Sequence, residues 1–237
     1  MFIYYPMILC HAPMEDRPID VSPIGYVDTL VGNVVQALER AGIRENTILV
    51  WTTDNGPQKG KATEDGACVP LIVNGPGLVP SGVVSDALVD ITDMLPTFAA
   101  LGGASPPARY VYDGQSMADL FTGKAQDSPR QWIMAMGGGA GAASTDPAQP
   151  PSAPKNKTVY RDRAIRDKQF KLYIGQDRKP EKMIDLLADP NEKNNILDSV
   201  ASGIHSDPAA QAALEKFLAV EAGFPAQDAN PHCAAAE

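Results

Sequence analysis

Cysteine is scarce in this sequence, which has only three among its 237 residues: Cys10, Cys68 and Cys233. Their odd number and wide spacing predict no disulfide framework, although the count leaves room for one disulfide. No C-x-x-C pair occurs, which excludes the usual spacing of a structural zinc site or a redox dithiol. Cysteine usage therefore leaves the cellular compartment open.

Long apolar runs are also missing. No run approaches the roughly 18–20 residues that a membrane-spanning helix needs, so we expect no membrane span. The apolar opening segment, residues 1–10, lacks a basic start and a small-residue cleavage site, so it is a poor signal peptide. Its aromatic and β-branched residues instead predict a buried strand over residues 2–9.

Positive charge is in short supply as well. The 29 acidic residues outnumber the 20 Lys and Arg residues, which gives a formal net charge of -9. Because phosphate backbones are bound by Lys and Arg, this balance argues against a nucleic-acid partner. Neither the G-x-S-x-G signature of serine hydrolases nor a G-K-[ST] phosphate loop occurs, so neither chemistry is supported.

What the sequence does contain is an alternation of helices and strands in its first half. Apolar residues at helical spacing predict a helix over 24–41, with Gly42 at its C-terminal cap. Short apolar runs predict strands at 47–53 and 69–73, and a second helix is expected at 91–101. Strands that alternate with helices favour an α/β fold with crossover connections.

The second half differs in composition, and we expect three parts in all. Residues 1–125 form the α/β part, and residues 126–158, rich in Gly, Ala, Ser and Pro, form a flexible linker or loop. The remaining residues, 159–237, are predicted to form a small C-terminal α+β subdomain. Alternating charged and apolar residues indicate an antiparallel sheet there, followed by a helix at 208–220 and a mobile tail.

Polar side chains follow the predicted strands where open α/β sheets bind their ligands. Asp54 and Asn55 come directly after a buried strand, and their oxygens are ligands suited to Ca²⁺ or Mg²⁺. A cation at Lys59 or Lys61 could hold an anionic substrate and stabilise charge on a leaving oxygen. His11, just past the first predicted strand, could donate a hydrogen bond to an anion or protonate a leaving group.

Each of these residues also has a simpler interpretation. The sequence Asp54-Asn55-Gly56-Pro57 is favourable turn chemistry on its own. An isolated lysine in a loop is usually solvated, and His11 would then be an ordinary loop histidine. The signal favouring a site is the combination of oxygen ligands, cations and an imidazole, each placed after a strand.

These segments resemble the sulfatase family. Residues 47–57, TILVWTTDNGP, resemble the family's apolar strand ending in S/T-D-N-G, and residues 59–70, KGKATEDGACVP, resemble its lysine-to-proline signature. Further segments are similar to sulfatase sequence in the same order: 69–77, 85–97, 113–123, the opening strand with His11, 171–172 and 183–192. The match is dense over residues 1–123 and sparse beyond, and the order and spacing of its pieces make it specific.

The resemblance implies an alkaline-phosphatase-like α/β sheet flanked by helices, N-terminally truncated, with a small C-terminal antiparallel sheet plus helix. It implies an arylsulfatase-like hydrolysis of sulfate esters at a Ca²⁺ site, with Mg²⁺ as the alternative ion. By this carry-over Asp54 and Asn55 are metal ligands, and Lys59 and His11 are catalytic residues that contact the sulfate. Lys61 takes the place of Lys59 if the loop is offset by two residues.

The resemblance also implies a sulfated small molecule or glycan as substrate, and a periplasmic or secreted location by family habit. One departure concerns the family's nucleophile, a formylglycine made from a C/S-x-P-x-R motif in the N-terminal half of family members, which we expect this chain to lack. Cys68-Val69-Pro70 offers C-x-P, but Ile72 stands where arginine is required. The Asp-Asp pair that completes the family's metal site is missing too. We therefore expect no turnover from this chain alone.

Two other interpretations stay open. A phosphodiesterase or phosphonate hydrolase of the same superfold would share the metal-binding edge and differ in its nucleophile. A truncated remnant would act as a binding module without catalysis, and a calcium titration would test whether a metal site is retained. A truncated sheet would also expose an edge, which favours self-association through that edge.

Overall fold

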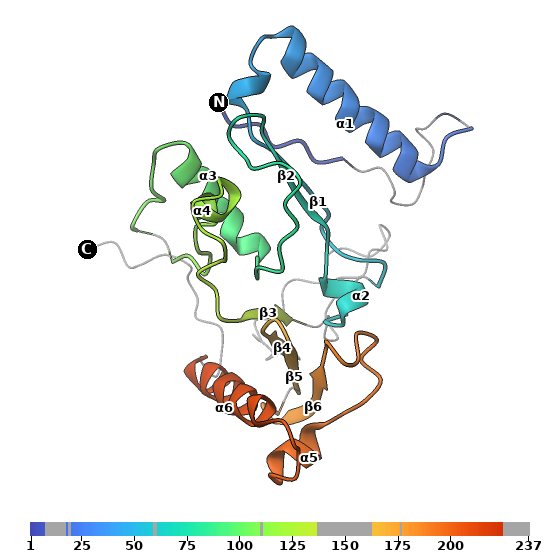
Figure 1. Cartoon of the computed structure of the whole chain (residues 1–237), viewed down its shortest axis with the longest axis vertical. Helices are drawn as coiled ribbons and strands as arrows, with labels where there is room; N and C mark the ends of the chain where they lie inside the picture. The colour runs from blue at the N-terminus through green and yellow to red at the C-terminus, as the bar shows by residue number, and fades with distance from the viewer. Residues whose placement is uncertain are drawn as a thin grey trace, which may run out of the picture. The chain divides into compact units, whose positions relative to one another are not determined.

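A computed structural model describes residues 1–7, 18, 20–58, 61–109, 111–136, 163–175 and 177–224 of the chain. The chain divides into two compact units. Unit 1 comprises Met1–Val50 and Val73–Gly82, and unit 2 comprises Trp51–Ile72 and Val83–Glu237. Figure 1 labels the helices and strands of both units.

The long helix of unit 1 is α1, Pro23–Arg40, which confirms the helix predicted over 24–41. It begins at Ser22, whose hydroxyl accepts a hydrogen bond from the backbone N–H of Gly25 at 3.0 Å. It ends before Gly42, whose φ of 68° is the left-handed conformation that glycine adopts at low cost. The short 3₁₀ helix η1, Arg44–Asn46, follows.

A two-stranded sheet joins β1, Leu49–Thr52, to β2, Leu71–Asn74, and both strands lie where apolar runs predicted them. Near the start of β1, the guanidinium of Arg44 donates to the carbonyl oxygen of Thr47 at 3.0 Å and to the side-chain oxygen of Asn74. These bonds tie the residue that ends β2 to the turn that precedes β1.

The strand predicted over residues 2–9 is not formed in its described part, residues 1–7, so that prediction is wrong there. Phe2, Ile3, Tyr4 and Tyr5 are more than half exposed. A strand needs a neighbouring strand to pair its backbone N–H and C=O groups. The apolar composition of this segment favours a strand, but whether a strand forms depends on a pairing partner in the tertiary structure.

Unit 2 contains the helix predicted over 91–101, which begins as the 3₁₀ helix η2, Ile91–Asp93, and continues as α3, Met94–Leu101. Three short helices are additional to the prediction: α2, Glu64–Ala67; α4, Ala118–Phe121; and α5, Leu197–Ala201. Each is only about one turn long, too short for its apolar spacing to be visible in the sequence.

The predicted small antiparallel sheet is confirmed, and its strands lie in chain order: β3, Ile133–Met136; β4, Arg163–Arg166; β5, Phe170–Ile174; and β6, Pro180–Asp185. In its register Arg166 lies opposite Lys171, and Lys171 lies opposite Ile184. Strand β3 precedes residue 159, the expected start of the C-terminal subdomain. The predicted boundaries of the three parts stay a prediction.

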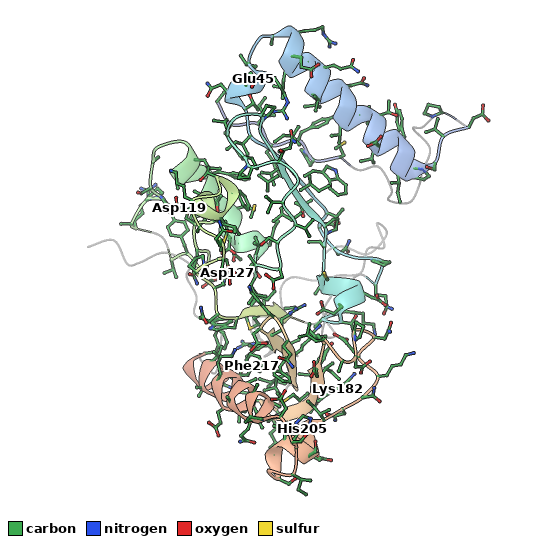
Figure 2. The ribbon with its side chains drawn as sticks, viewed as in Figure 1. Glu45, Asp119, Asp127, Lys182, His205 and Phe217 are labelled. Carbon is green, nitrogen blue, oxygen red and sulfur yellow. The ribbon has the colours of Figure 1, made fainter. Side chains whose placement is uncertain are left out.

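The main core of unit 2 lies on one face of this sheet. Side chains along a strand alternate between faces, and Phe170, Leu172 and Ile174 of β5 all point into the core. Helices α5, Leu197–Ala201, and α6, Pro208–Gly223, cover that face. Phe217 of α6 is fully buried between helix and sheet (Figure 2). This helix confirms the one predicted over 208–220.

The unit is thus a mixed α/β structure that ends in an antiparallel sheet and a helix. Within the described residues, no helix combines the length and the apolarity that a bilayer crossing requires. Cys68 is a free, exposed thiol, whereas Cys10 and Cys233 lie outside the described residues.

Candidate functional site

The candidate site begins where β1 ends, at Asp54 and Asn55. The amide nitrogen of Asn55 donates to Oδ1 of Asp54 at 2.9 Å, and the hydroxyl of Thr53 donates to the Asn55 carbonyl oxygen at 3.2 Å. The Asp54 side chain is exposed. These local bonds are those of a polar turn, and they leave one carboxylate oxygen of Asp54 and the amide oxygen of Asn55 outside the bond between the two side chains.

The residues after this turn fold back on it as a closed loop, which we define as residues 54–66. The backbone N–H of Gly56 donates to the carbonyl oxygen of Gly66 at 3.0 Å, and that of Gln58 donates to Asp65 at 3.2 Å. A Cβ on Gly56 would collide with the Asp65 carbonyl, and a Cβ on Gly66 with the Lys61 carbonyl. Glycine is therefore required at both positions, because two backbone segments approach closely there.

The closed loop brings some of the predicted site residues into one short stretch of structure. Its described part holds Asp54 and Asn55 at one end and the exposed Lys61 near its middle, where the Lys61 N–H donates to the Gln58 carbonyl oxygen at 3.1 Å. Lys59 and His11 lie outside the described residues. The roles assigned to all five residues stay predictions.

One face of the C-terminal sheet, opposite the apolar core, carries a charged cluster that reaches this loop. Lys171 of β5 is 1% exposed, and its Nζ donates to Oε1 of Glu64 at 2.8 Å and to Oε1 of Glu192 at 2.7 Å. The guanidinium of Arg166 donates to Oε2 of Glu64 at 2.5 Å, and the hydroxyl of Tyr173 donates to Oε2 of Glu192 at 2.7 Å. We call these five residues the Lys171 cluster.

The charges in the Lys171 cluster balance. Arg166 and Lys171 lie opposite each other on neighbouring strands, an arrangement that would be repulsive alone. Glu64 accepts from both of them, one with each carboxylate oxygen. Buried charges are tolerated when they are paired and hydrogen-bonded, and the two carboxylates meet this requirement.

Sequence reasoning gave no role to Glu64, Lys171 or Glu192. One signal pointed to them: Lys171 interrupts the apolar run of β5, FKLYI. A lysine is almost never fully buried unless it is paired, so a buried strand with a central lysine predicts acidic partners. The sequence does not say which ones, because Glu64 lies 107 positions away.

The pKa values in the Lys171 cluster follow from its contacts. Burial disfavours the charged form of Glu192, but hydrogen bonds from Lys171 and Tyr173 outweigh it and hold the Glu192 pKa below its ordinary value of 4.5. Burial, together with the hydrogen bond and negative charge of Glu192, raises the pKa of the Tyr173 hydroxyl well above its ordinary value. Tyr173 therefore stays protonated and acts as a donor.

Acid is expected to destabilise unit 2 partly through Glu192. Because its pKa is depressed in the folded state, its contribution is complete above pH 4.5 and is lost as the pH falls through the folded value. We expect Glu192→Gln to lower stability at neutral pH and to flatten its dependence on pH below about 4.5. Urea midpoints measured over this pH range test the expectation. Equal slopes for both proteins would contradict it.

A second buried ion pair joins two of the sequence segments that resemble sulfatases. Asp93, at the end of η2, is fully buried and accepts from the Nε of Arg130 at 2.7 Å and from its Nη2 at 2.5 Å. It also accepts from the backbone N–H of Gln115 at 2.7 Å, and Nη2 of Arg130 lies 3.1 Å from the Asp113 carbonyl oxygen. Arg130 falls within the predicted linker, and sequence reasoning assigned it no role.

The donor set of the closed loop fits a hard divalent cation in kind. Asp54 and Asn55 offer carboxylate and amide oxygens, which are the ligand types of Ca²⁺ and Mg²⁺. Among the described residues, no three His, Cys, Asp or Glu side chains gather in a way that would hold a metal ion. A Ca²⁺ ion takes about six to eight oxygens, so these two residues would supply only part of its coordination.

Comparison with known proteins connects these features. A family profile described as Sulfatase matches residues 21–104, which include the whole closed loop. Mouse arylsulfatase G is 33% identical over 174 residues, covering 59% of this chain and 33% of the relative. Bovine N-acetylglucosamine-6-sulfatase is 28% identical over 199 residues, covering 73% of this chain and 35% of the relative. The chain thus spans about a third of the length of these relatives.

Solved structures show the same fold. One, described in complex with its substrate D-glucosamine-2-N,6-O-disulfate, has a TM-score of 0.64 and 25% identity, covering 84% of this chain and 38% of its own. A phosphonate monoester hydrolase from Silicibacter pomeroyi has a TM-score of 0.57 and 24% identity, covering 81% of this chain and 37% of its own. The latter likeness concerns the fold alone.

Proposed function

We propose that this chain supplies the metal-binding and anion-binding edge of a hydrolase that cleaves sulfate esters, because its residues 21–104 match the sulfatase family and similar proteins are named as sulfatases. Asp54 and Asn55 would hold a Ca²⁺ ion, or Mg²⁺ as the alternative. Lys59 and His11 would contact the sulfate group, and Lys61 would serve in place of Lys59 or beside it. The family assignment and the alkaline-phosphatase-like fold class predicted from sequence are both confirmed.

The closed loop is the observation that carries this proposal. Its backbone bonds hold two oxygen ligands and a lysine-bearing segment within one stretch of 13 residues, 54–66. Its glycines leave no room for other residues where the backbone segments meet. A loop held this tightly favours a role that needs fixed side-chain positions over the alternative of a solvated turn.

In the proposed reaction the chain contributes electrostatics and positioning. A bound divalent cation would act as a Lewis acid on a sulfate oxygen. The lysine ammonium would stabilise negative charge on the sulfate and on the leaving oxygen, and His11 would hydrogen-bond the anion or protonate the leaving group. One string that fits C/S-x-P-x-R does occur, Ser105-Pro106-Pro107-Ala108-Arg109, so the expectation that the sequence holds none is wrong. This string follows the closed loop, whereas the family's motif lies in the N-terminal half, so we assign this chain no nucleophile.

The substrate class we propose is a sulfated sugar. Among similar proteins, one is described with a bound glucosamine disulfate, and others are named as N-acetylgalactosamine-6-sulfatase and N-acetylglucosamine-6-sulfatase. A periplasmic or secreted location is proposed with it, by family habit. The fold likeness to a phosphonate monoester hydrolase makes a phosphonate ester the second candidate substrate.

Calcium binding provides the test of the metal edge. With a Kd near 1 mM, 10 mM CaCl₂ would raise the free energy of unfolding of the chain by about 1.4 kcal/mol. We expect Asp54→Ala to abolish this gain, because it removes the charged ligand. Urea unfolding with and without CaCl₂ measures it.

The matched control for this test is Asp28→Ala, which removes an exposed carboxylate from α1. It should keep the full calcium effect. A gain that is equal in wild type and Asp54→Ala, or no gain in wild type, would rule out the proposed metal edge. Inorganic sulfate and methylphosphonate, added separately in the same unfolding assay, distinguish the two substrate candidates by which anion raises the free energy of unfolding more.

A further inference from the structure

We infer that the Lys171 cluster positions the closed loop, so that Glu64, Lys171 and Glu192 are positioning residues for Lys61, one of the proposed anion-binding residues. This inference rests on the proposed function. It assigns the C-terminal sheet a part in the site, although the residues predicted to carry the chemistry all lie in the first 61 positions of the sequence.

Glu64 belongs to the loop, and the other four residues of the Lys171 cluster contact the loop at three separate groups. The Glu64 carboxylate accepts from Lys171 at 2.8 Å and from Arg166 at 2.5 Å. The backbone N–H of Glu64 donates to Oε1 of Glu192 at 3.2 Å. The Tyr173 hydroxyl lies 3.4 Å from the Ala62 carbonyl oxygen. Side chain and backbone are both held, which fixes the orientation of this segment as well as its distance from the sheet.

The loop has few apolar contacts of its own that could replace these bonds. Of its described residues, only Gly66 is buried, and Asp54, Pro57, Gln58, Lys61 and Asp65 are exposed. Helix α2 is a single turn, too short to be stable by itself. The Lys171 cluster, by contrast, sits on a sheet whose other face is a closed apolar core. The rigid element therefore determines where the loop lies.

The loop transmits this placement to the candidate site over a short distance. Lys61 is three residues before Glu64, so its Cα lies within about 11 Å of that of Glu64 even in a fully extended chain. The bond from Gly56 to Gly66 links the other end of the loop, next to Asn55, to the same anchor. A displacement of about 1 Å is enough to impair a catalytic group, so loosening this anchor should weaken anion binding.

The experiment compares hydrogen exchange and sulfate binding in the full chain. Glu64→Gln keeps the side-chain length and removes the charge that Lys171 and Arg166 share. We expect amides of residues 61–67 to exchange about tenfold faster in Glu64→Gln, while β5 amides keep their rates. We also expect the Kd for inorganic sulfate, measured by calorimetry in CaCl₂, to rise about tenfold.

Four further variants complete the test. Lys171→Arg should retain most sulfate affinity and Lys171→Met should lose it, a rescue that a purely structural defect would not show. Tyr173→Phe removes only one hydroxyl and covers the case in which Lys171→Met fails to fold. Glu181→Gln, an exposed glutamate of β6, is the control and should change neither readout.

The outcomes separate this inference from the proposed function. Unchanged exchange at 61–67 in both Glu64→Gln and Tyr173→Phe would overturn the positioning role. So would a loosened loop with unchanged sulfate affinity. If Lys59→Ala weakens sulfate binding and Glu64→Gln does not, the positioning role alone fails. If the wild-type chain binds no sulfate, the proposed function fails and the positioning role fails with it.

Discussion

Replacing Arg130 by methionine is expected to lower the free energy of unfolding of unit 2 by about 3–5 kcal/mol. The guanidinium donates to both carboxylate oxygens of Asp93, at 2.7 Å from Nε to Oδ2 and at 2.5 Å from Nη2 to Oδ1. Asp93 is fully buried, so the substitution leaves a carboxylate without its counter-charge in a dry environment. Removing one partner of a buried pair costs much more than the pair itself contributes.

The exposed pair Lys124–Asp119 provides the control. Its atoms are 4.0 Å apart and its side chains are 74% and 73% exposed, so Lys124→Met should change stability by less than about 1 kcal/mol. Urea unfolding followed by tryptophan fluorescence and circular dichroism measures both variants. A loss below about 1 kcal/mol for Arg130→Met would contradict the prediction.

Replacing Phe217 by alanine is expected to cost about 3–5 kcal/mol, through lost apolar burial and the cavity left behind. Phe217 is fully buried in the core cluster that α6 forms with β5 (Figure 2). Trp132 packs against this cluster and lies edge-on to Phe224, with ring centroids 5.9 Å apart. Its fluorescence should therefore report the loss of packing directly.

Leu218, the next residue of α6, is 39% exposed and provides the matched control. Leu218→Ala should cost about 1 kcal/mol or less, because much of that side chain already contacts water. If both substitutions cost the same, the packing of α6 on the sheet described here would be wrong. If Phe217→Ala alone is severe, the result supports the packing of α6 on the sheet.

Local pattern predicted most of the regular structure. Helix α1, strands β1 and β2, the helix beginning at Ile91 and helix α6 all lie where spacing and turn residues placed them. These elements carry their signal in consecutive residues, since apolar periodicity and capping are local. The short helices contain too few residues to show apolar periodicity. Strand β3 was not predicted, because it lies at the edge of a segment rich in small residues.

The roles of the candidate site residues stay predictions. Asp54, Asn55 and Lys61 lie together in the closed loop, because a strand end and the turn after it are adjacent in sequence. Sequence reasoning gave the residues that anchor this loop no role, because Lys171 and Glu192 meet Glu64 across 107 and 128 positions. Only Lys171 is recognisable in the sequence as unusual, because it places a charge inside an apolar strand.

The sequence by itself predicted the resemblance to sulfatases, the order of the elements and the residue types that suit a metal and an anion, since all of these are recorded in short segments. The tertiary structure decided which charges are buried together, and that residues 1–7 form no strand despite their composition. Burial and strand pairing depend on partners far away in the chain. The free energy of a buried charge such as Lys171 depends on those partners, which local sequence does not specify.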